Sequence, residues 1–140
     1  MRWKMTVVWL AIAVVVALGL YVRLAPSDPS RWHVPPKYQT DRDVAHGAAR
    51  VIDEVPGRLK RIDEIARNWP RTRQLDGSLG VGKITYVTRT RFWGFPDYTT
   101  VKIIDGKIVM WARSRFGRKD FGVNRARLEA WLEALRRAEA

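Results

Sequence analysis

The residues best suited to chemistry lie in one stretch of fifteen, 113–127, in which six side chains are Arg or Lys. The stretch also contains Gly117 and Gly122, and it leads into Asn124, a residue type that caps helix N-termini. Free backbone N–H groups at a helix start and the forked donors of arginine both bind phosphate or carboxylate. The pattern predicts an anion-binding corner built from Arg113, Arg115, Arg118, Lys119, Asp120, Asn124 and Arg127.

The same stretch also fits a purely structural corner. In that alternative Asp120 pairs with Arg113 or Arg115, and the two glycines only shape the turn. The glycine spacing is neither that of a P-loop nor that of a dinucleotide-binding fingerprint, so no nucleotide class is indicated. The anion pocket and the structural corner both stay open.

Two aspartates, Asp97 and Asp120, stand beside arginine-rich loops and form the candidate pair for acid–base catalysis. Aspartates beside arginine usually stay ionised in salt bridges, so we favour a non-enzymatic role. The two histidines, His33 and His46, lie outside any cluster of ligand residues, and the chain has no cysteine. We therefore expect no metal site and no cofactor.

A strand face on which basic and aromatic side chains alternate is the second candidate surface. It combines Arg89 and Arg91 of one strand with Trp111, Arg113 and Arg115 of another. Guanidinium groups stack on rings, and such a face suits a lipid headgroup, an anionic glycan or a nucleic acid. The alternatives are that the face is solvated or that the first helix of the domain covers it.

Positive charge is concentrated in one part of the chain. The net charge is +12 at pH 7, and residues 71–127 alone carry thirteen basic and four acidic side chains. Residues 41–68 carry six of each. This distribution favours a specific anionic partner, such as an anionic lipid, a glycan or an acidic protein, over charge that serves only solubility.

The elements that position these residues follow from hydrophobic periodicity. Alternating residues at 98–104 and 107–114, joined by Asp105-Gly106, predict a β-hairpin with a two-residue turn. That turn sets Ile103 opposite Ile108, and opposed residues share a face. The expected core face is Val101, Ile103, Ile108, Met110 and Ala112.

Further elements are expected on both sides of the hairpin. Apolar spacing predicts helices from Asp41 to Val55, from Leu59 to Trp69 and after an Asn124 cap. Strands are expected at 71–75, before an Asp76-Gly77 turn, and at 83–92. The fold class is α+β: an N-terminal transmembrane helix, then a two-layer domain of an antiparallel sheet of three to four strands with two to three helices.

The N-terminal segment is predicted to be a membrane anchor. Residues 5–22 form an uncharged run of 18, roughly 27 Å as a helix, which is longer than a signal-peptide core and precedes no small-x-small cleavage pattern. Arg2 and Lys4 before it favour a cytoplasmic N-terminus, with the domain on the periplasmic side of the inner membrane. Nucleic acid is then the least expected partner.

A proline-rich spacer follows the anchor, which divides the chain into residues 1–25, 26–40 and 41–140: anchor, spacer and domain. Four prolines between positions 26 and 36 predict a semi-rigid segment that lifts the domain off the membrane. Trp32 and His33 interrupt it, and they either dock on the domain or rest among lipid headgroups.

The segments 92–97 and 113–127 resemble a bacterial and plastid family known as domain of unknown function 1499. The shared features are a Phe-x-Asp segment at Phe95–Asp97 and a Gly-x-x-Asp-x-Gly-x-Asn-x-x-Arg run from Gly117 to Arg127. The resemblance covers residues 59–135, and residues 24–36 are similar to a membrane-anchored proteobacterial subgroup. Tyr98 follows Asp97 where many members have a second aspartate, which weakens a carboxylate pair. The resemblance implies a fold and a placement in the cell, but it does not indicate any particular activity.

These observations predict a membrane-anchored, extracytoplasmic, non-enzymatic domain that binds an anionic ligand or partner through its basic corner. Two alternatives remain: a hydrolase-like envelope enzyme that uses Asp97 and Asp120, and a scaffold subunit of an envelope protein complex.

Overall fold

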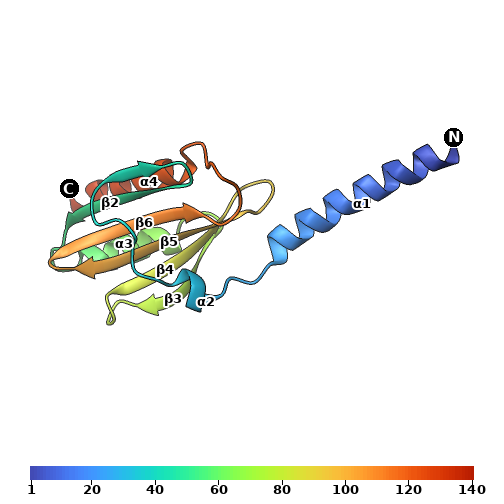
Figure 1. The fold of residues 1–140 in the computed structure, drawn as a ribbon. Helices are drawn as coiled ribbons and strands as arrows, with labels where there is room; N and C mark the ends of the chain where they lie inside the picture. The colour runs from blue at the N-terminus through green and yellow to red at the C-terminus, as the bar shows by residue number, and fades with distance from the viewer.

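The computed structural model describes residues 1–140: a long N-terminal helix followed by an α+β domain, in which two helices pack on one face of an antiparallel sheet (Figure 1). The strands lie in the order β1-β2-β6-β5-β4-β3. The helices are α1 (Arg2–Leu24), α2 (Pro29–Trp32), α3 (Arg58–Arg67) and α4 (Val123–Glu139). The strands are β1 (Arg42–Val44), β2 (Gly47–Asp53), β3 (Thr72–Ser78), β4 (Lys83–Arg89), β5 (Pro96–Ile104) and β6 (Lys107–Ser114).

The predicted hairpin is confirmed as β5 and β6, including its register. Ile103 pairs with Ile108 across the turn, and Asp105 and Gly106 both have positive φ, as a type I′ turn requires. The expected core face is buried, with Val101, Ile108, Met110 and Ala112 fully inaccessible and Ile103 packed at its margin. Local turn chemistry and side-chain alternation are therefore sufficient to specify this pair of strands.

The sheet has six strands, more than the three to four expected, because the helix predicted from Asp41 to Val55 is wrong. That segment forms β1 and β2, with His46 in the turn between them. β2 pairs with β6 along its whole length, from Gly47 opposite Arg113 to Asp53 opposite Lys107. A Cβ on Gly47 would lie 2.4 Å from the Ala112 carbonyl oxygen, so glycine permits this close pairing. Pairing with the edge of β6 therefore makes this segment a strand, although its apolar residues recur at helical spacing.

The predicted turn at Asp76-Gly77 is also wrong. The strand expected at 71–75 is present but continues to Ser78, and its register shifts between Gln74 and Asp76 as a β-bulge. Gly77, with φ 94°, lies inside β3, where an added Cβ would clash with the Lys83 carbonyl oxygen at 2.0 Å. The Asp-Gly pair therefore bends a strand instead of ending one.

One hydrophobic core lies between the sheet and the two domain helices. The predicted second and C-terminal helices are confirmed as α3 and α4, whose apolar stripes face the sheet. Trp131 of α4 lies at the centre of this core, edge-on to Tyr86 with ring centroids 5.8 Å apart and to Trp69 at 6.3 Å. This packed core gives the corner between β6 and α4 a rigid support.

The spacer lies on the opposite face of the sheet, as the docking hypothesis for Trp32 and His33 predicted. The Trp32 ring stacks on Tyr98 at 4.2 Å, and His33 Nδ1 lies 2.7 Å from Thr85 Oγ1. The end of α1 also touches the domain, because Arg23 donates a hydrogen bond to the Phe92 carbonyl.

Candidate functional site

The corner between β6 and α4 is shaped by backbone conformation. Gly117, Phe121 and Gly122 all have positive φ, and the chain turns through them from the end of β6 into α4. Asp120 Oδ1 accepts the Gly122 N–H at 2.9 Å, and its Oδ2 accepts the Asn124 N–H at 3.2 Å. Asp120 therefore caps the helix. The prediction that Asn124 is the N-cap is wrong, since Gly122 occupies that position.

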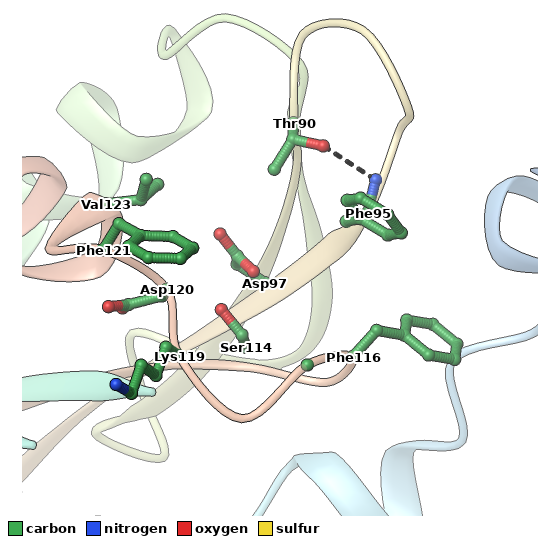
Figure 2. Close-up of a pocket in the computed structure, with 10 residues that line it drawn as sticks. Thr90, Phe95, Asp97, Ser114, Phe116, Lys119, Asp120, Phe121 and Val123 are labelled. Atoms are coloured by element: carbon green, nitrogen blue, oxygen red, sulfur yellow. Dashed lines mark hydrogen bonds between the residues drawn. The ribbon is translucent and has the colours of Figure 1, made fainter. Parts of the chain in front are cut away.

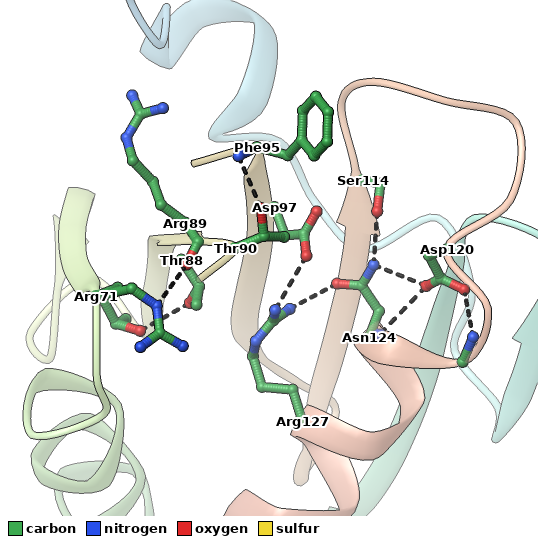
Figure 3. Close-up of polar contacts among 12 residues, drawn as sticks. Arg71, Thr88, Arg89, Thr90, Phe95, Asp97, Ser114, Asp120, Asn124 and Arg127 are labelled. Atoms are coloured by element: carbon green, nitrogen blue, oxygen red, sulfur yellow. Dashed lines mark hydrogen bonds and ion pairs between the residues drawn. The ribbon is translucent and has the colours of Figure 1, made fainter. Parts of the chain in front are cut away.

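Asn124 is instead the centre of a buried polar network that joins the corner to the sheet (Figure 3). Its Nδ2 donates to Ser114 Oγ at 3.0 Å and to Asp120 Oδ2 at 2.8 Å. Its Oδ1 accepts from Arg127 at 2.7 Å, and Arg127 also donates to Asp97 Oδ2 at 3.0 Å. The candidate residues Asp97, Asp120, Asn124 and Arg127 are thus brought together as one connected unit.

Asp97 is the most deeply buried carboxylate in this network, at 2% exposure. Burial raises the pKa of its carboxyl group, and the Arg127 guanidinium opposes that rise. The neighbouring Asp120 carboxylate acts in the same direction as burial. Asp97 is therefore a carboxylate that folding makes easier to protonate.

A pocket of about 320 Å³ opens over this network (Figure 2). Asp97 and Ser114 face each other in it, with Phe121 on one side and Phe95 and Phe116 on the other. The polar lining is completed by Thr90, Lys119 and Asp120. The candidate carboxylates Asp97 and Asp120 therefore border the same cavity, although each is held by donors of the protein itself.

The other predicted site residues lie in two different places. Arg118 and Lys119 are exposed on the corner loop, and Lys119 lines the pocket. Arg113 and Arg115 lie under the spacer, where Arg113 donates to the Trp32 carbonyl and Arg115 donates to the Pro26 carbonyl at 2.9 Å. Neither arginine pairs with Asp120, whose carboxylate accepts only from Gly122 and Asn124, so the salt bridge of the structural-corner hypothesis is wrong.

Arg113 is held in an aromatic cage. Its guanidinium lies 4.1 Å from the Trp111 ring centre and within 6.0 Å of the Trp32 and Tyr98 rings. It donates to Thr100 Oγ1 at 2.8 Å, and burial lowers its pKa to about 9. The spacer, and not the first helix of the domain, thus covers the Arg113 and Arg115 part of the basic-aromatic face. Arg91 is exposed and lies outside the strand, because β4 ends at Arg89.

Sequence reasoning missed the role of Ser114 and of the phenylalanines in the pocket. The motif itself contained Ser114, but its bond to Asn124 depends on how β6 meets α4. Phe121 is 92% exposed, an unusual state for a large apolar side chain that only the fold reveals.

The chain contains no group of three or more His, Asp or Glu side chains placed to hold a metal ion.

A comparison with known protein families matches residues 22–135 to the family DUF1499, described as a protein of unknown function. The matched range begins at the end of α1 and runs through the spacer, the sheet and most of α4. A search of curated proteins finds no matching relative. The match covers most of the length of the chain. The chain therefore belongs to the DUF1499 family, as the resemblance of the corner motif implied.

Proposed function

We propose that the chain is a membrane-anchored, non-enzymatic binding domain whose ligand site is the corner pocket. The observation that carries this proposal is the pocket of about 320 Å³, which combines buried polar groups with three aromatic side chains. Pockets that mix an apolar lining with a few convergent polar groups are typical of small-molecule sites. The buried network beneath the pocket supplies the rigid support that such a site needs.

The lining favours a ligand with both hydrogen-bond donors and a negative group. Asp97, Ser114 and Thr90 offer acceptors for a hydroxyl or ammonium group. Lys119 lines the same pocket and Arg118 is exposed beside it, so both suit a phosphate or carboxylate. An anion deep in the pocket would meet two carboxylates, so we place the anionic group against Lys119.

The proposed location is the periplasmic side of the inner membrane. Helix α1 is long and apolar enough to cross a membrane, and none of its residues is buried by the domain. Arg2 and Lys4 precede the apolar run, which supports a cytoplasmic N-terminus. The ligand would then be a small molecule of the envelope.

Binding of phosphoethanolamine, which carries an ammonium and a phosphate group, tests the pocket. We expect the full chain in detergent micelles to bind it more tightly than glycerol 3-phosphate, which lacks the ammonium group. Lys119→Gln should weaken binding about tenfold or more, since it removes a charge-assisted hydrogen bond. Lys60→Gln removes an exposed lysine of α3 outside the pocket and is the matched control. Equal calorimetric titrations for both variants would contradict the proposal.

A hydrolase-like enzyme is the second candidate, because Asp97 and Asp120 border one cavity. In that case the chain would release p-nitrophenol from p-nitrophenyl acetate or phosphate, and Asp97→Asn would abolish the release. We expect no turnover, since Asp97 is paired with Arg127 and Asp120 is occupied by the N–H groups of the α4 start. Turnover that is lost in the variant would establish the enzyme instead.

A further inference from the structure

We propose a second binding site, at the junction of α1 with the domain, for an anionic phospholipid: its phosphate lies among Arg23, Arg89 and Arg115, and an acyl chain lies along α1. This site lies beyond the corner pocket and rests only on the proposed membrane anchor. Three features carry it: unpaired positive charge, apolar grooves on α1, and aromatic side chains beside them.

The three arginines meet around the end of α1, and each bonds only to uncharged acceptors. Arg23 donates to the Phe92 carbonyl at 3.0 Å, and Arg89 donates to the Gly94 carbonyl at 2.9 Å and the Val22 carbonyl at 3.4 Å. Arg115 donates to the Pro26 carbonyl and to the Tyr98 hydroxyl. None of the three takes part in any of the ion pairs of the structure.

The positive charge at this junction is not compensated by the protein. Burial lowers the pKa of Arg89, and the neighbouring Arg73, Arg115 and Arg23 guanidiniums lower it further. No carboxylate acts on Arg89, and only the Tyr98 hydroxyl acts in the opposite direction. An anion bound here would remove this mutual repulsion, and a phosphate accepts bonds from several guanidiniums at once.

Two apolar grooves run along α1 on either side of Gly19. One, of about 220 Å³, is lined by Val15, Leu18, Gly19, Val22, Trp93 and Phe95. The other, of about 450 Å³, is lined by Val16, Gly19, Leu20, Arg23, Phe92 and Trp93. The missing side chain of Gly19 leaves room in both. The larger groove ends at Arg23, the side chain that would meet the phosphate.

The depth of these grooves identifies the occupant as a lipid. Gly19 precedes Arg23 by four residues, roughly 6 Å along a helix, so the grooves lie on the part of α1 that the bilayer surrounds. Phe92 and Trp93 are 77% and 50% exposed beside them, where aromatic side chains sit at a membrane interface. A soluble anion would satisfy the arginines but would leave these apolar surfaces uncovered.

Gly94 has a role in this arrangement. It has a φ of 71°, and a Cβ there would lie 3.0 Å from Arg23 Nε. Glycine therefore allows the Arg23 side chain to lie flat against the loop between β4 and β5. This contact fixes the guanidinium at the mouth of the larger groove.

Native mass spectrometry of the full chain tests the site. The chain is extracted into mixed micelles with equal amounts of phosphatidylglycerol, which is anionic, and phosphatidylcholine, which is zwitterionic. We expect one phosphatidylglycerol molecule to be retained preferentially, and the R23Q/R89Q variant to reduce this retention about tenfold or more. R136Q/R137Q removes two charges at the far end of α4 and should retain the lipid. Equal retention of the two lipids would overturn the proposal.

Two further comparisons distinguish a bound lipid from a soluble anion. R23K/R89K preserves the charge and should keep the preference for phosphatidylglycerol, whereas Gly19→Leu fills the grooves and should lose it; Ala17→Leu, outside both grooves, is its control. Displacement of the lipid by millimolar glycerol 3-phosphate, or retention unaffected by Gly19→Leu, would overturn the lipid assignment. A chain that fails to bind phosphoethanolamine at the corner pocket but still retains phosphatidylglycerol would refute only the proposed pocket.

Discussion

At the scale of single residues, the corner motif acts mainly as a structural unit. The polar atoms of Asp120, Asn124 and Arg127 are hydrogen-bonded to the start of α4, to Ser114 and to Asp97. Buried polar networks of this kind stabilise a fold only when every member has a partner. The ligand chemistry is therefore left to the groups that border the cavity, above all Asp97 and Lys119.

The buried carboxyl group of Asp97 predicts a specific pH dependence. Its pKa is raised above 3.8 in the folded state, so the folded chain binds more protons than the unfolded chain between pH 3.8 and the folded pKa. The stability that this group contributes is therefore present at low pH and is lost as the pH rises through that window. Asp97→Asn removes the term, so the wild-type chain should lose stability relative to the variant as the pH rises.

Urea denaturation of the full chain in micelles, followed by tryptophan fluorescence from pH 3.5 to 7, measures this difference. Asp105→Asn removes a carboxylate from the exposed hairpin turn and provides the control. A difference between wild type and Asp97→Asn that is constant across this range would contradict the role assigned to burial.

Much of the site could be predicted at this scale, and the rest depends on tertiary contacts. The motif spacing correctly grouped Asp120, Asn124 and Arg127, because residues three or four positions apart around a helix start are neighbours in any fold. Strand alternation correctly put Arg113 on the face away from the core. That a segment eighty residues earlier covers this face depends on non-local packing, which no local pattern encodes.

At the scale of elements, the spacer acts as a strap across the outer face of the sheet. The Trp32 ring is stacked on Tyr98, and the Trp32 carbonyl accepts a hydrogen bond from Arg113. The segment between α1 and β1 is therefore bound to the sheet. The hairpin of β5 and β6 was predictable because its turn and pattern are local. β1 and β2 were not, because β1 pairs only with β2, and the pairing of β2 with β6 joins positions about sixty residues apart.

Removal of the Trp32 ring should release the strap. An aromatic pair contributes about 0.5 to 1.5 kcal/mol beyond its buried area, so Trp32→Ala should raise the open fraction roughly tenfold. Tryptic cleavage after Arg31 in the full chain, measured by the rate of appearance of the fragment, should rise to the same extent. Phe121→Ala, which removes an exposed ring from the corner loop, is the control, and equal cleavage rates in the two variants would argue against a strap.

At the scale of the whole molecule, the charge distribution divides the molecule into surfaces with different partners. Of the arginines between positions 71 and 127, Arg113 binds the strap through the Trp32 carbonyl, and Arg127 binds Asp97 in the corner network. Arg89 and Arg115 lie at the end of α1, without carboxylate partners. Part of the positive charge of residues 71–127 thus lies at the end of α1, where the domain would meet the proposed membrane surface.

The proposed anchor predicts how the full chain behaves in a cell. It should remain in the membrane pellet after alkaline carbonate washing and should dissolve only in detergent, because an apolar run of 18 residues inserts stably. Protease added to spheroplasts should cut the domain. Protection of the domain under these conditions would reverse the orientation, and release by carbonate would exclude an uncleaved anchor.

The strap and the arginine contacts together join α1 to the sheet without a free hinge. Arg23 bonds α1 to the β4–β5 loop and Arg89 bonds it to the end of β4, and the chain from Pro26 to His33 is held against the strands. A helix that turns about its own axis in a bilayer would therefore carry the corner pocket around with it at constant height. The pocket would sweep a ring parallel to the membrane, and a ligand would meet it only in that one layer above the lipid surface.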